Sequence, residues 1–162
     1  MNPSAYNNMV QIVQTSTYVV ILNEMVHNAR IVPLDGRPHL SLNIPQWVGD
    51  SRGRWDRDTL VVETRNFRSD SIAGPGGATS TDPRNARLVE RFTRSDPDTL
   101  LYEYTMTDPH TWTRPWTARV PMTKSADPLY EYACHEGNYS MTHRLSASRA
   151  AERKARSESP KD

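Results

Sequence analysis

Cysteine is nearly absent from this chain: Cys134 is the single one among 162 residues. An intramolecular disulfide and a multi-cysteine zinc site are therefore both excluded. Long apolar runs are absent too, and the longest, residues 18–22, is far too short to cross a bilayer. Residues 1–8 have neither the basic nor the apolar segment of a signal peptide, so none is expected in this stretch.

Charge of one sign is not in excess, because 20 basic and 19 acidic residues leave a net charge of +1. This balance gives no field that would attract nucleic acid or an anionic membrane, so neither partner is expected. The chain also lacks a phosphate-binding P-loop, a dinucleotide-binding glycine motif, a serine nucleophile elbow and a zinc-protease HExxH motif. The sequence leaves enzymatic activity, and the identity of any cofactor or metal, unknown.

Short β-branched and apolar runs, separated by turn sequences, are the main feature present. They predict strands at residues 10–13, 18–22, 26–32, 54–55, 59–64, 88–94, 100–107, 116–122 and 129–134. Short connections without intervening helices imply antiparallel pairing. We therefore expect a mainly β fold, an antiparallel barrel or strongly curved sheet of about seven to nine strands with one C-terminal helix, and a sandwich as the alternative.

Composition divides the chain into three parts. Residues 1–140 form the expected antiparallel β domain, with a loop rich in Gly, Ser and Pro at 68–85. Residues 141–156 are rich in Ala, Arg, Lys and Glu without Gly or Pro, which predicts a helix with a thin apolar stripe. Residues 157–162 are expected to form a disordered tail.

Three long motifs give the chain a specific resemblance. They are residues 30–39 (RIVPLDGRPH), residues 49–64 (GDSRGRWDRDTLVVET) and residues 132–138 (YACHEGN). Nearly the whole chain resembles the C-terminal half of a family of bacterial proteins, usually secreted, for which no activity is established. The resemblance implies a secreted or periplasmic location for a longer parent and raises the alternative of a missing N-terminal half. The chain departs from the family pattern at residues 56–57, where members have Glu-Gly.

A candidate catalytic group combines His135 with Glu24 and His27. His135 ends the last expected strand, where scaffolds display functional side chains, and an imidazole can act as a general base or ligate a metal. Glu24 and His27 have the spacing of a helical metal pair, but a strand would turn them to opposite faces unless a bend lies near Asn23 or Asn28. We expect His135 within one side-chain layer of Glu24 or His27, if the barrel closes with their ends at one rim. The alternative is that His135 only caps the helix.

Candidate ligand-binding residues lie in the loops and at a pair of tryptophans. Arg37 and His39, with Asp35, Asp50 and Arg52 in neighbouring loops, could hold a carboxylate or phosphate, because guanidinium groups bind such anions through two hydrogen bonds. In an enzyme, Arg30 or Arg37 would hold an anionic group of the substrate. The alternative is an Asp–Arg network that only stiffens the loops. Trp112 and Trp116 offer indole faces that suit sugars or aromatic ligands, unless they are simply buried at a barrel end.

Asn138 is a further candidate for ligand contact, and its alternative role is to cap the C-terminal helix. Three function hypotheses follow from these residues. The first is a small-molecule-binding β domain of a secreted protein, with an unknown ligand. The second is a hydrolase or lyase that uses a His/Glu site with or without a metal. The third is a structural half of a larger protein, which exposed apolar surface would favour. The partners expected across the three hypotheses are a small-molecule ligand, an N-terminal half and a second copy of the chain in a homo-oligomer.

Overall fold

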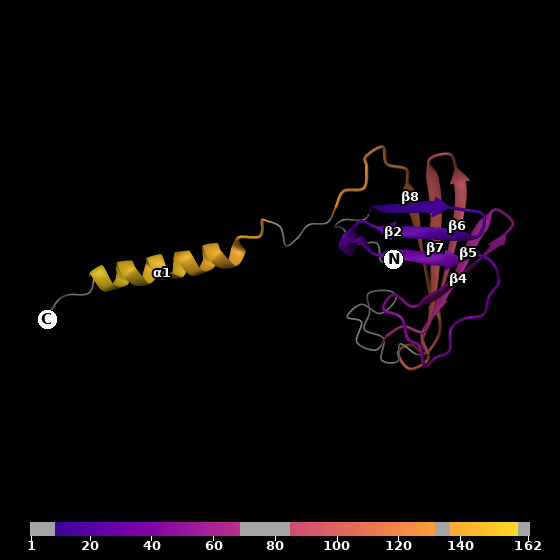
Figure 1. Ribbon diagram of the computed structural model, residues 1–162, viewed down its shortest axis with the longest axis horizontal. Helices are drawn as coiled ribbons and strands as arrows, with labels where there is room; N and C mark the ends of the chain where they lie inside the picture. The colour runs from indigo at the N-terminus through magenta and orange to yellow at the C-terminus, as the bar shows by residue number, and fades with distance from the viewer. Residues whose placement is uncertain (1–8, 69–84, 132–136, 159–162) are drawn as a thin grey trace. The chain divides into compact units, whose positions relative to one another are not determined.

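The computed structural model describes residues 9–68, 85–131 and 137–158 (Figure 1). The chain divides into two compact units, residues 1–131 and residues 132–162. In the described residues, the first unit holds eight strands in two antiparallel sheets and the second holds one helix. The predicted mainly β, antiparallel fold with a C-terminal helix is confirmed at this level.

The first sheet has three strands in the order β1-β2-β3, namely β1 (Val10–Gln14), β2 (Tyr18–Asn23) and β3 (Ala29–Pro33). Thr15 closes the first turn, because its Oγ1 accepts the backbone N–H of Tyr18 at 3.0 Å. The predicted pairing of the first two strands is confirmed. The strand predicted at 26–32 is wrong at its start, because the 3-10 turn η1 (Met25–His27) precedes β3.

The second sheet has five strands in sequence order, each antiparallel to its neighbour: β4 (Asp50–Asp56), β5 (Thr59–Arg65), β6 (Arg87–Asp96), β7 (Thr99–Thr107) and β8 (Trp116–Thr123). The strands predicted in these regions are present, although β4 begins earlier than residue 54. Residues 129–131 of the last predicted strand lie in no strand, and residues 132–134 are outside the described residues. The predicted loop at 68–85 lies mostly outside them as well.

The described strands form no closed barrel, so that part of the prediction is not confirmed. No ladder joins β3 to β4, because the chain leaves β3 at Pro33 and returns through residues 35–49. The two strands nevertheless come close at Gly53, where an added Cβ would lie 2.8 Å from Val32 Cγ1 and 2.7 Å from Leu34 Cδ2. A larger residue than glycine would push the two sheets apart at this point.

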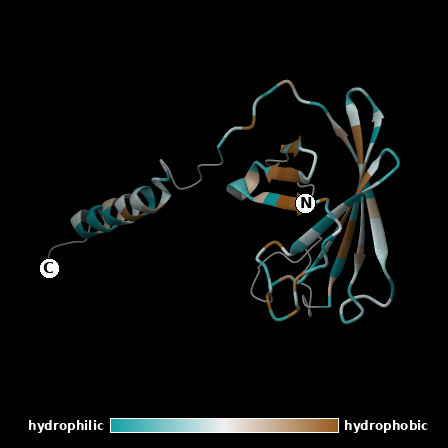
Figure 2. Ribbon diagram, turned by 45° about the vertical axis from the view of Figure 1, so that its right-hand side comes forward, coloured by the Kyte–Doolittle hydropathy of each residue, from teal (hydrophilic) through white to brown (hydrophobic). Residues whose placement is uncertain are grey.

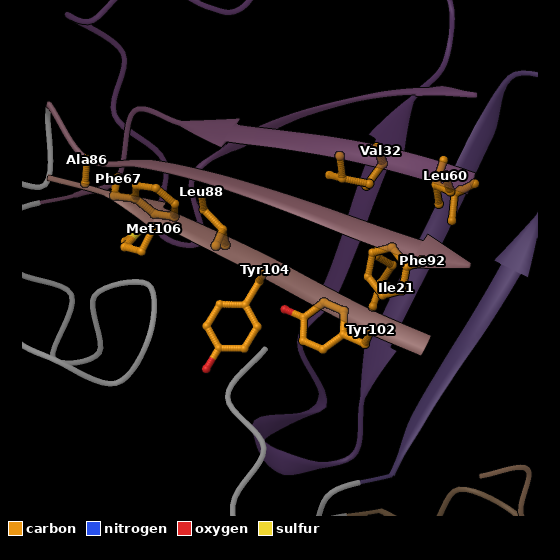
Figure 3. Close-up of a cluster of buried hydrophobic side chains, with 12 residues drawn as sticks. Ile21, Val32, Leu60, Phe67, Ala86, Leu88, Phe92, Tyr102, Tyr104 and Met106 are labelled. Atoms are coloured by element: carbon orange, nitrogen blue, oxygen red, sulfur yellow. The ribbon is translucent and has the colours of Figure 1, made fainter. Parts of the chain in front are cut away.

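The hydrophobic core lies between the inner faces of the two sheets. Alternate residues point inward, as the predicted period of two requires. Figure 3 shows these side chains, which are buried in one cluster, coming from both sheets: Ile21, Val32, Leu60, Leu88, Phe92, Tyr102, Tyr104 and Met106. The rings of Phe92, Tyr102 and Tyr104 are stacked, with centroids 5.0 and 5.3 Å apart along the row.

The helix α1 (Ser140–Glu158) begins within one residue of the predicted start and continues two residues beyond the predicted end. The Oδ1 atom of Asn138 accepts the backbone N–H of Ser140 at 3.2 Å, so this residue helps to start the helix, as the capping alternative predicted. Its few large apolar side chains are exposed, with Met141 at 70% and Leu145 at 48%. No helix in the described part of the chain is long and apolar enough to cross a membrane.

Candidate functional site

Arg30 lies in an ion pair inside the core. Its two terminal nitrogens donate to the two carboxylate oxygens of Glu90 at 2.6 and 2.9 Å, and the hydroxyl of Tyr102 donates to the same carboxylate at 2.9 Å. Glu90 is fully buried and Arg30 is 9% exposed. The pair connects β3 of the first sheet with β6 of the second.

The charges in this buried cluster are set by their mutual contacts. Burial by itself raises the pKa of Glu90, but the charge of Arg30 and the hydrogen bonds from Arg30 and Tyr102 outweigh burial and lower it. Burial, followed by the charge of Glu90, raises the pKa of Tyr102. A carboxylate, a guanidinium and a neutral phenol therefore face one another at neutral pH. Glu90 was not among the predicted site residues, although it lies between Leu88 and Phe92 on the inward side of an alternating strand, which is a signal for a buried charge.

His39 lies in a second polar cluster, on the outer face of the second sheet. Its Nδ1 is 2.9 Å from Asp50 Oδ2, which also accepts the backbone N–H of Leu40, and Asp50 Oδ1 accepts from Arg52 at 2.6 Å. The other ring nitrogen of His39 lies 3.6 Å from Glu63 Oε1. Because both ring nitrogens face carboxylates, the arrangement ties a loop to a sheet rather than presenting a general base to a substrate.

Glu63 extends this cluster to Arg65 and to Arg87, whose guanidinium donates to it at 2.5 Å. Burial raises the pKa of Glu63, but the hydrogen bond and the charge of Arg87, and then Arg65, lower it overall. Asn66 adds a further tie, since its side-chain amide donates to the carbonyl of Leu40 at 2.7 Å. The geometry is that of the predicted alternative, an Asp–Arg network that stiffens the loop.

Arg37 does not join His39. Its guanidinium binds both carboxylate oxygens of Asp35 two residues away, and one nitrogen lies 3.4 Å from the hydroxyl of Tyr18. Hydrogen bonds from Arg37 lower the pKa of Asp35 to about 2. The candidate ligand-binding residues Arg30, Arg37 and His39 therefore lie in three separate contacts.

The catalytic group is only partly described. A bend does follow Asn23, and the backbone N–H of His27, at the end of η1, donates to the carbonyl of Glu24 at 3.2 Å. Among the described residues, no three His, Cys, Asp or Glu side chains are arranged to hold a metal ion. His135 lies outside the described residues, so its role and its predicted closeness to Glu24 or His27 stay predictions.

Trp112 and Trp116 pack against each other and against the core. Their rings meet edge to face with centroids 5.5 Å apart, and Trp116 makes a second such contact with Tyr104 at 5.5 Å. Both rings are partly buried against the hydrophobic cluster. This is the ordinary burial that the sequence offered as the alternative to ligand stacking.

The most unusual surface is the outer face of the first sheet. The register places Val13, Val20 and Ile31 in one row across the three strands. The adjacent paired row consists of Gln11, Leu22 and Ala29. Ile31 is 61% exposed and Val13 is 47% exposed. Figure 2 shows brown, apolar colour along much of these three strands.

The outer face of the second sheet has the opposite chemistry. Threonine pairs lie at 2.8 Å across neighbouring strands, at Thr59–Thr93 and Thr105–Thr117. One ion pair joins neighbouring strands, Arg119–Glu103, and another spans β5 from β6 to β4, Arg91–Asp56. Such pairs are ordinary for a sheet face in water. The same domain therefore has one outer face built for solvent and one that is mostly apolar.

Comparison with models of protein families, with curated proteins and with solved structures found no match to this chain.

Proposed function

We propose that this chain is a non-catalytic β domain that binds a protein partner through the outer face of its first sheet. Exposed apolar surface was the feature expected to favour the third hypothesis, in which the chain is the structural half of a larger protein. The apolar row of Val13, Val20 and Ile31 carries the proposal, because Val13 and Ile31 are exposed and Val20 between them is partly exposed. Contiguous exposed apolar surface of this kind marks interaction sites in soluble proteins.

The contrast between the two outer faces supports the proposal. A sheet face that stays in water gains nothing from an unbroken apolar row, and the second sheet carries threonine and ion pairs instead. Covering the exposed parts of Ile31 and Val13 would gain about 1 kcal/mol for each side chain. The face therefore has a thermodynamic reason to be covered by a partner.

The size of the face favours an amphipathic helix as the covering element. Five residues in β1 and in β3 give a length of about 17 Å, and two strand spacings give a width of about 10 Å. A helix is about 10 Å across and spans that length in about 11 residues.

The test uses a synthetic peptide and methyl NMR. The peptide has about 12 residues, Lys and Leu only, with Leu at helical positions i, i+3, i+4 and i+7, and its control is a scrambled peptide of the same composition. The helical peptide should shift the methyl signals of Val13, Val20 and Ile31. Equal shifts with the scrambled peptide, or no shifts at all, would contradict the proposal.

Matched variants complete the test. Val13→Thr combined with Ile31→Thr should abolish the peptide shifts and leave the thermal unfolding midpoint nearly unchanged, because the face is not part of the core. Val89→Thr on the outer face of the second sheet is the control and should keep the shifts. A strong loss of stability in the double variant would show that the face is already buried within the chain, which would overturn a partner-binding role.

A further inference from the structure

A shallow hollow of about 700 Å³ lies where three hairpin ends meet. Gln14 and Trp55 lie near the ends of β1 and β4, so the hollow lies at the open end of the space between the two sheets. Its walls come from the β1, β4–β5 and β6–β7 ends: Gln14, Trp55, Arg57, Asp58, Arg94, Asp96 and Pro97. Ligand sites are common at such mouths between packed layers.

Trp55 differs from the other three tryptophans. Trp112 and Trp116 pack edge to face with each other, and the guanidinium of Arg68 lies 5.4 Å from the ring centroid of Trp47. In the described part of the chain, no aromatic ring or guanidinium covers Trp55, which is 46% exposed. Its indole is therefore partly exposed where it lines the hollow, and no described ring or guanidinium is stacked on it.

The polar lining has hydrogen-bonding capacity to spare. No described residue forms a hydrogen bond or ion pair with the side chain of Arg57 or Asp58, and Arg94 makes one such bond, to the carbonyl of Pro97 at 2.8 Å. The turns that carry these groups are held by their own bonds, such as the backbone N–H of Asp98 to Asp96 Oδ1 at 3.0 Å. Donors, acceptors and an aromatic face are thus presented together on ordered turns.

We propose that this hollow binds a neutral carbohydrate, with one sugar ring stacked on Trp55. A pyranose has an apolar C–H face for the indole and hydroxyl groups that accept from Arg57 and Arg94 and donate to Asp58. Two Arg and two Asp cancel in charge, which disfavours nucleic acid and strongly anionic ligands. The open shape leaves one side of the sugar in water, so the affinity is weak, with a Kd on the order of 1 mM. The site is separate from the apolar sheet face and does not depend on the proposed function.

The experiment follows the tryptophan indole N–H signals of ¹⁵N-labelled protein during titration. The ligands are glucose, galactose, mannose, xylose and their β-linked disaccharides, with glycerol as the polyol control and glucuronate as the charged control. Trp55→Phe assigns the Trp55 signal by its loss. At least one neutral sugar should give a saturable shift of the Trp55 signal, without an equal shift of the Trp47 signal.

Two variants sharpen the result. Asp58→Asn should weaken binding about tenfold, because it removes a charged acceptor while keeping the size of the side chain. Trp47→Phe removes an exposed tryptophan elsewhere and should leave the affinity unchanged. The proposal is overturned if no sugar gives a saturable shift, if glycerol gives the same shift, or if glucuronate binds more tightly than every neutral sugar.

Discussion

Replacing Glu90 by glutamine should destabilise the β domain strongly, because it leaves Arg30 buried without its counter-charge. The wild-type carboxylate accepts both terminal nitrogens of Arg30 and the hydroxyl of Tyr102. The glutamine side chain would keep the size of the original, but its NH₂ group would face a guanidinium that can only donate. Breaking a buried ion pair at one partner costs about 3–5 kcal/mol. That is a large share of the roughly 5–15 kcal/mol that stabilises a typical domain.

A matched variant separates charge from packing. Arg30→Met, Glu90→Leu and Tyr102→Phe together remove both charges and the hydroxyl, so the cluster keeps no buried ion without its counter-charge. This triple variant should be within about 2 kcal/mol of the wild type, because the cost of desolvating two ions disappears with their attraction. Urea unfolding followed by tryptophan fluorescence gives the free energy of unfolding of each protein.

The effect of Glu90 also has a defined pH dependence. The pKa of Glu90 is lowered in the folded protein, so its stabilising effect is fully present above the ordinary glutamate pKa of about 4.3. It is lost as the pH falls through the lower, folded-state value. The difference in stability between wild type and Glu90→Gln should therefore shrink in acid. A loss below about 1 kcal/mol at pH 7, or a triple variant as unstable as the single one, would refute the reasoning.

Three further predictions concern single residues. Gly49 has φ +78, and a Cβ added there would lie 2.6 Å from a Phe67 ring carbon, so Gly49→Ala should lower the free energy of unfolding in urea by about 2–4 kcal/mol. Gly36 has φ +73 but no atom within 4 Å of an added Cβ, so Gly36→Ala should cost about 1 kcal/mol. Equal losses in the two variants would contradict the steric argument. Asn66 has φ +56, and its side-chain amide donates to the carbonyls of Leu40 and Ser41, so Asn66→Ala should lower the thermal unfolding midpoint by about 5–10 °C. An unchanged midpoint would show that these hydrogen bonds do not hold the loop. The Asp35 carboxyl should titrate by NMR with a pKa of about 2, and Arg37→Gln should return that pKa toward the ordinary value of about 4; an unchanged pKa would contradict the pairing.

Local patterns were sufficient to predict most of the strands. The runs around β2, β5, β6, β7 and β8 alternate or are β-branched, and the turns between them carry Asp, Pro and Thr, so pairing of neighbours followed directly. The strand predicted at 26–32 was wrong at its start, because a 3-10 turn occupies Met25–His27 and ends with a left-handed φ of +41 at His27. A bend near Asn23 or Asn28 was considered only as an exception to that strand. Arg30, Arg37 and His39 were close in sequence, but their separation in space depends on which partner each found across the fold.

An antiparallel β domain followed by a polar helix can be predicted from the chain alone, because the period of apolar residues and the turn chemistry are local properties. Residues 18–22 can also be seen to be apolar on both faces. The tertiary fold settles that one of those faces is buried and the other only partly buried, and that Glu90 meets Arg30 across 60 positions of sequence. The Arg30–Glu90 pair joins the two sheets, and the way two sheets pack depends on the fit of all their side chains together, which no single strand encodes.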